Sequence, residues 1–175
     1  SLALLVDSVH AVTDSAGLLL ALTAAVLMDR PPDQRRTWGL IRLEVLAAAA
    51  QATVLLAIGV FALVEGVRRL LSNAPPEVPG RLVLIFGVIG LIANLIALGV
   101  LAGGRDESLN LRAAFLEVLN DALGSLAVIV GAVVIMTTGW HRADAVAGIV
   151  IALLIIPRAL VILGEAGNVL LESTP

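Results

Sequence analysis

The chain contains no cysteine and no tyrosine, and all eleven of its basic residues are arginine. Without cysteine there can be no disulfide, no thiolate nucleophile and no cysteine-based metal site. Cysteine usage therefore gives no indication of the redox compartment in which the protein lies. Any transition metal that the chain binds must therefore be held by histidine and carboxylate side chains.

Charge is also scarce. Only 14% of the residues are charged and 59% are hydrophobic, with a mean hydropathy of +1.05, whereas a soluble domain is about half apolar and about a quarter charged. The formal net charge of -3 and the lack of a basic patch exclude a nucleic-acid partner. The composition predicts a membrane protein.

Five long apolar segments account for most of the chain. Each is close to the roughly 20 residues that cross about 30 Å of hydrocarbon. They cover residues 2–28, 43–67, 82–103, 111–138 and 145–171. Because lipid offers no hydrogen bonds to an open backbone, all five are predicted to be helices of an all-α, polytopic membrane bundle. The first and third loops carry more arginine than the second and fourth, which places them in the cytoplasm.

Four ionisable residues interrupt the apolar segments in a repeated pattern. His10 and Asp14 are four residues apart, and Glu117 and Asp121, 107 residues later, repeat that spacing. Residues four apart share a helical face, and the cost of such groups in lipid requires them to face inward. Three carboxylates beside an imidazole repel one another unless they are protonated or bind metal. The pattern predicts a divalent cation site made of all four residues.

The ligand types leave the cation open. Imidazole suits zinc, cobalt, nickel and iron, whereas a carboxylate-rich set favours manganese or iron. The alternative to a metal site is a hydrogen-bonded cluster that only holds two helices together.

Other polar residues lie in the same segments. Asp7 shares a helical face with His10, as an outer ligand, a hydrogen-bond partner of that imidazole or a solvated residue at the mouth of the site; we favour the last two roles. Gln51, Asn94 and Asn120 are amides of the kind that join membrane helices by hydrogen bonds, with Asn94 nearest the cation pathway.

The fourth loop and fifth segment carry four further residues with predictable roles. We expect His141 to be solvated and Asp144 to cap the N-terminus of the last helix. Pro157 is predicted to kink that helix, and Arg158 to extend to the lipid headgroups.

Several sequence blocks resemble the cation diffusion facilitator, or cation efflux, family over nearly the whole chain. They are DSVHAVTDSAG, RRTWGLIRLEVLAA, ESLNLRAAFLEVLNDALGS, GWHRADAVAGIVIALLI and VLLESTP. The resemblance implies six helices with a metal site between the second and fifth, which correspond to the first and fourth segments here. It assigns His10 and Asp14 to one half of that site and Glu117 and Asp121 to the other.

The same resemblance implies that residues 1–175 are the transmembrane domain, with five of six helices, and that the first helix and a C-terminal cytoplasmic domain are absent. The full-length protein is then expected to be a homodimer in a bacterial cell membrane.

The function implied is secondary active export of a divalent cation from the cytoplasm in exchange for protons, with no prosthetic group. Zinc is the first candidate, with cobalt, iron, manganese, cadmium and nickel also open, because zinc-transporting members typically have histidine where this chain has Glu117. An intramembrane metal enzyme is disfavoured since no HExxH motif occurs. A membrane metal-binding scaffold or sensor with a structural site is the remaining alternative.

Overall fold

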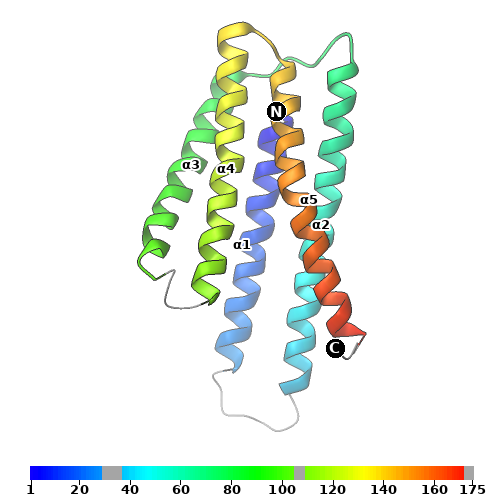
Figure 1. Ribbon diagram of the computed structural model, residues 1–175, viewed down its shortest axis with the longest axis vertical. Helices are drawn as coiled ribbons and strands as arrows, with labels where there is room; N and C mark the ends of the chain where they lie inside the picture. The colour runs from blue at the N-terminus through cyan, green and yellow to red at the C-terminus, as the bar shows by residue number, and fades with distance from the viewer. Residues whose placement is uncertain (29–36, 105–108, 172–175) are drawn as a thin grey trace.

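The computed structural model describes residues 1–28, 37–104 and 109–171, with side chains at residues 1–16, 19, 45–104, 112 and 114–171. The described chain forms five long helices (Figure 1): α1 (Leu2–Met28), α2 (Thr37–Leu71), α3 (Gly80–Ala102), α4 (Leu109–Thr138) and α5 (Arg142–Leu170). Each predicted apolar segment is a helix, so the predicted all-α bundle is confirmed. The largest difference in a boundary is at α2, which begins at Thr37 and not at residue 43.

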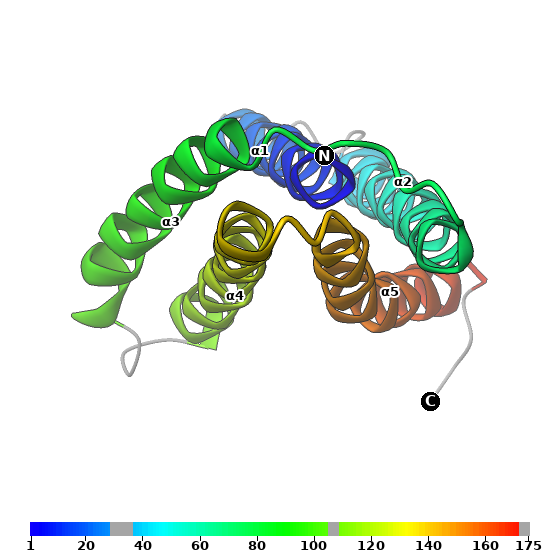
Figure 2. The ribbon, with the colours of Figure 1, turned by 90° about the horizontal axis from the view of Figure 1, so that it is seen from above.

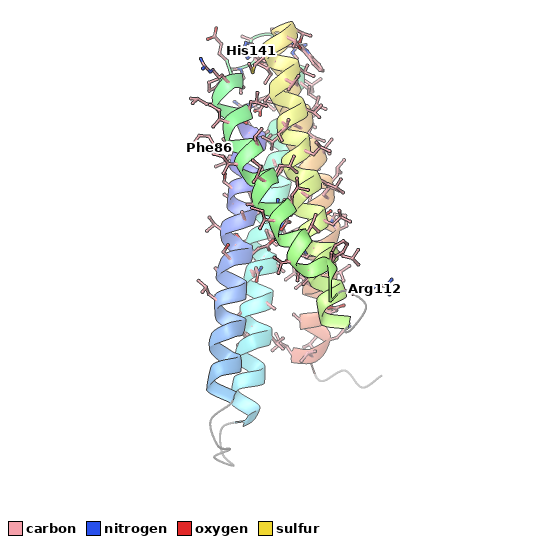
Figure 3. The ribbon with its side chains drawn as sticks, turned by 90° about the vertical axis from the view of Figure 1, so that its left-hand side faces the viewer. Phe86, Arg112 and His141 are labelled. Carbon is pink, nitrogen blue, oxygen red and sulfur yellow. The ribbon has the colours of Figure 1, made fainter. Side chains whose placement is uncertain are left out.

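Within the described residues, four helices contain stretches long and apolar enough to cross a membrane: Val45–Leu71, Gly80–Ala102, Ala114–Thr138 and Arg142–Leu170. Phe86 is 54% exposed and points away from the bundle, while His141 lies near its upper end and Arg112 near the lower end of α4 (Figure 3). The chain is therefore a multi-pass membrane protein, as predicted. The first and third loops, on which the predicted cytoplasmic side rests, lie largely outside the described residues.

The helices form two pairs that pack on each other through α4 and α5, and α1 packs against both pairs. α2 packs mainly on α5 and α3 packs mainly on α4, whereas α1 contacts all four. Seen from above, α1 lies between the two pairs (Figure 2). The pairs diverge toward the end that carries the C-terminus, and α5, which contains Pro157, changes direction along its length (Figure 1).

Close packing of α5 depends on small side chains. A Cβ atom at Gly66 of α2 would lie 2.5 Å from Ile149 Cγ1 of α5, so the two helices can approach this closely only with glycine there. The buried face of α5 is itself rich in small residues, among them Ala145, Ala147, Gly148, Ala152 and Ala159.

At the upper end of Figure 1, hydrogen bonds tie the two connecting loops to each other. The Val78 backbone N–H donates to His141 Nδ1 at 3.0 Å, and Arg142 donates to the Ser72 carbonyl oxygen at 2.7 Å. His141 is half-buried and accepts a hydrogen bond, so it is not simply solvated as predicted. Gly139 has a φ of 68°, which glycine adopts at little cost in the turn between α4 and α5.

Asp144 caps a different helix from the one predicted. Its side chain is 2% exposed and accepts hydrogen bonds from the backbone N–H groups of Leu2 at 2.6 Å and Ala3 at 3.3 Å. α5 begins at Arg142, before Asp144, so this carboxylate lies in the first turn of its own helix. It faces sideways and caps the N-terminus of α1, and the prediction for α5 was wrong.

Candidate metal site

His10, Asp14 and Asp121 meet where α1 packs against α4. One ligand atom from each lies within 4.8 Å of the others. His10 Nε2 is 2.9 Å from Asp14 Oδ2 and 3.4 Å from Asp121 Oδ1. Two ligands held about 2.1 Å from a tetrahedral ion are themselves about 3.4 Å apart, so these separations are on the scale of a metal site.

The three side chains are withdrawn from solvent, with exposed fractions of 6% for His10, 15% for Asp14 and 25% for Asp121. Two of their oxygens, Asp14 Oδ2 and Asp121 Oδ1, are buried, and His10 Nε2 is the one nitrogen of the described residues that can donate to them. Buried polar atoms are otherwise almost always hydrogen-bonded, and buried charges are paired or bind metal. A cation beside His10 Nε2 would satisfy both oxygens, so the side chains present fit a divalent metal.

Gln51 of α2 orients one of these carboxylates. Its Nε2 donates to Asp14 Oδ1 at 3.2 Å, which leaves the second oxygen, Oδ2, facing His10. Such hydrogen bonds to ligating carboxylates fix their direction. Asn94, the amide predicted to lie nearest the pathway, instead donates to Ser125 Oγ at 3.3 Å and joins α3 to α4.

Asp7 lies one turn before His10 and faces α4. A Cβ atom built on Gly124 would be 3.2 Å from Asp7 Oδ1, so the glycine leaves room for this carboxylate at the α1–α4 interface. Asp7 is outside the group of three convergent ligands. Its position is that of a polar neighbour of the site and not of an outer ligand.

Glu117, the fourth predicted ligand, lies on the same face of α4 as Asp121 but outside the convergent group. Its carboxylate pairs with the guanidinium of Arg158, and its side chain is 42% exposed. The structure thus brings three of the four predicted residues together and gives the fourth a different partner.

Arg158 was not predicted at the site, and the prediction that it extends to the headgroups was wrong. Besides Glu117, it places Nη1 at 3.3 Å from His10 Nε2 and Nη2 at 3.6 Å from Asp14 Oδ1. It is the seventeenth residue of α5, about 24 Å along the helix, so the carboxylates are nearer than either helix end. The cost of an ionisable group in lipid, which singles out the intramembrane acids in the sequence, applies to this arginine as well.

Comparison with known proteins gives a consistent result. The profile of the cation efflux transmembrane domain family matches residues 1–171. The chain is 42% identical over its whole length to the metal cation efflux system protein CzcD of Cupriavidus metallidurans. It is 41% identical to the zinc transporter ZitB of Escherichia coli and 36% identical to a cadmium, cobalt and zinc/H(+)-K(+) antiporter of Bacillus subtilis. In each comparison it covers 55 or 56% of the relative's length.

Proposed function

Because the chain belongs to the cation efflux family, we propose that it is the membrane-spanning part of a secondary active transporter that exports a divalent transition metal, zinc before other cations, in exchange for protons. Members of this family are transporters and not enzymes, which excludes the intramembrane metal enzyme. The names of the relatives support the proposal, since they include a metal cation efflux protein, a zinc transporter and a cadmium, cobalt and zinc antiporter.

The observation that carries the proposal is the convergence of two buried carboxylate oxygens, Asp14 Oδ2 and Asp121 Oδ1, on the single nitrogen His10 Nε2, with no other hydrogen-bond donor among the described residues. A dication and protons can each neutralise such a cluster. Carboxylate and imidazole ligands bind metal only when they are deprotonated, so proton uptake releases the metal and metal binding releases protons. This competition couples the two ions without covalent chemistry.

The arrangement of helices supports alternating access. The site lies on α1 and α4, and α1 contacts every other helix, while the pairs α3–α4 and α2–α5 diverge toward one end (Figure 1). Rocking of one pair against the other would expose the site first to one side and then to the other. The larger number of arginines in the first and third loops supports a cytoplasmic position for the ends of the helices that these loops connect. Glu117 as a fourth ligand and the homodimer of the full-length protein stay predictions.

Proton-driven zinc flux in proteoliposomes made with the full-length protein tests the proposal. Asp14→Ala and Asp121→Ala should each abolish flux, because each removes one of the two carboxylates that converge on His10 Nε2. Glu165→Ala, which removes an exposed acid from α5, should leave flux unchanged. Wild-type flux in either site variant would overturn the mechanism. Zinc binding by the wild-type protein without any flux would favour the scaffold or sensor.

A further inference from the structure

One fixed positive charge lies against the candidate metal site. Arg158 belongs to α5, which contributes no residue to the convergent group, yet its guanidinium contacts side chains from both α1 and α4. It pairs with Glu117 and places Nη1 3.3 Å from His10 Nε2. His10 Nε2 is also the atom that faces Asp14 and Asp121. The guanidinium therefore borders the space that a bound cation would use.

The charge on this side chain is permanent. An arginine is not deprotonated in proteins, and a charged side chain within a membrane span persists only where it is paired or faces water. Arg158 is 24% exposed and has two acidic neighbours, Glu117 and Asp14. Its charge consequently belongs to the electrostatics of the site in every step of a transport cycle.

Counting charges shows which acid the arginine balances. Asp14, Asp121 and Glu117 supply three negative charges when ionised, and a ligating histidine is neutral. One dication leaves a single negative charge, which the guanidinium cancels. With a neutral residue at position 117, the two aspartates would already balance a dication. The guanidinium would then leave one uncompensated positive charge.

We propose that Arg158 and Glu117 form a matched charge pair that sets the affinity of the site for divalent cations. The inference rests on the proposed function, because it assumes that His10, Asp14 and Asp121 bind the cation. Arg158 lowers the affinity by repelling a dication, and Glu117 offsets that repulsion. The pair also holds the Glu117 carboxylate outside the convergent group.

Zinc binding to the purified full-length protein, measured by titration calorimetry at one fixed pH, tests the pair. Arg158→Gln should raise the affinity by about tenfold or more, because it removes a like charge next to the ion. Glu117→Gln should lower it by about tenfold, since the guanidinium then acts on Asp14 and on the ion without its partner. The double variant restores the net charge and should bind within about threefold of the wild type.

Two further variants separate charge from geometry. Arg158→Lys keeps the charge and should bind zinc with nearly wild-type affinity, while Arg68→Gln, which removes an arginine that is 80% exposed, should have no effect. The proposed charge pair would be overturned if Arg158→Gln bound zinc more weakly than the wild type, or if the double variant bound zinc as weakly as Glu117→Gln. Equal behaviour of Arg158→Lys and Arg158→Gln would overturn it as well.

Asp14→Ala in the same assay distinguishes this inference from the proposed function. If Asp14→Ala abolishes zinc binding and Arg158→Gln leaves the affinity unchanged, the metal site stands and the charge pair falls. If Asp14→Ala binds zinc like the wild type, the metal site itself is wrong, and the charge pair falls with it.

Discussion

The protein buries acidic side chains in two places, and their surroundings differ. Asp144, at the upper end, is 2% exposed, and its two oxygens receive the N–H groups of Leu2 and Ala3. At the metal site, Asp14 and Asp121 each keep one buried oxygen that has no donor among the described residues except the shared His10 Nε2. Burial and charge are common to both regions, so the difference in hydrogen bonding is what separates a structural acid from a candidate ligand.

The balance of charge differs in the same way. Near Asp144, Arg69 lies 3.9 Å away and also pairs with Glu65 at 2.8 Å, and Arg68 lies 3.6 Å from the same Glu65. Two fixed cations therefore accompany the two acids. At the site, Arg158 is the one arginine that the described contacts place beside the carboxylates, and it contacts two of the three, Asp14 and Glu117. The excess negative charge there calls for a further cation or for protons.

The largest expected effect is at the site itself. Asp121→Asn keeps the shape of the side chain but removes its charge, and we expect zinc affinity to fall by at least about a hundredfold, because even groups that only orient a ligand are worth about tenfold to a hundredfold. Calorimetry measures the affinity. Thermal stability should not fall, since the substitution relieves repulsion among the carboxylates. If Asp121→Asn binds zinc with wild-type affinity, Asp121 is not a ligand, and the distinction between a ligand acid at the site and a structural acid at Asp144 is lost.

Asp144→Ala should show the opposite pattern. The N–H groups of Leu2 and Ala3 lose their acceptor, and stranding such groups should lower the free energy of unfolding by about 1 to 3 kcal/mol. Denaturation of the full-length protein in detergent measures this loss, with the exposed Glu165→Ala as the control. Zinc affinity should not change, and a large loss of affinity at wild-type stability would contradict the structural role of Asp144.

Acid should weaken metal binding. The ligands His10, Asp14 and Asp121 bind a cation only when deprotonated, so the affinity should fall as pH falls. The expected change is about tenfold for each pH unit over which one proton is displaced per ion. Calorimetry in buffers of different ionisation enthalpy counts the released protons. Binding without proton release would contradict the competition that couples the two ions.

The sequence predicted the helices well and their neighbours poorly. Lipid forces an apolar run of this length into a helix, so all five segments could be identified. Which face meets which helix depends instead on close packing, such as that between Gly66 and Ile149, and nothing in a single sequence reveals it. The role of Asp144 was missed for this reason, because its hydrogen bonds reach across to α1.

The residues of the site also differ in how far the sequence could predict them. The spacing of His10 and Asp14 within one helix was visible in the sequence, and the 107-residue repeat pointed to Asp121. Gln51 and Arg158 reach the site from α2 and α5, and their contacts exist only after the helices have packed. For Arg158 a signal was present, since a charge in the middle of an apolar segment needs a partner.

Gln51→Leu tests the contact from α2. Loss of the hydrogen bond to Asp14 Oδ1 should let that carboxylate rotate, and zinc affinity should fall by about tenfold. Asn94→Leu makes the same change at an amide that bonds Ser125 and not a site residue, and should leave the affinity within about threefold of the wild type. Equal effects of the two substitutions would show that any amide in the bundle has this influence, and the orienting role of Gln51 would be rejected.

The smallest effect is expected at Gly124, where the boundary of the site is least sharp. A methyl group there would lie 3.2 Å from Asp7 Oδ1, so Gly124→Ala should displace Asp7 slightly. Alanine favours a helix over glycine by about 1 kcal/mol, and Gly164→Ala, with nothing within 4 Å, should gain that stability in full while Gly124→Ala gains less. Zinc affinity should stay unchanged in both, because Asp7 is outside the convergent group. A tenfold loss in Gly124→Ala alone would extend the site to Asp7 and move its boundary one turn toward the N-terminus of α1.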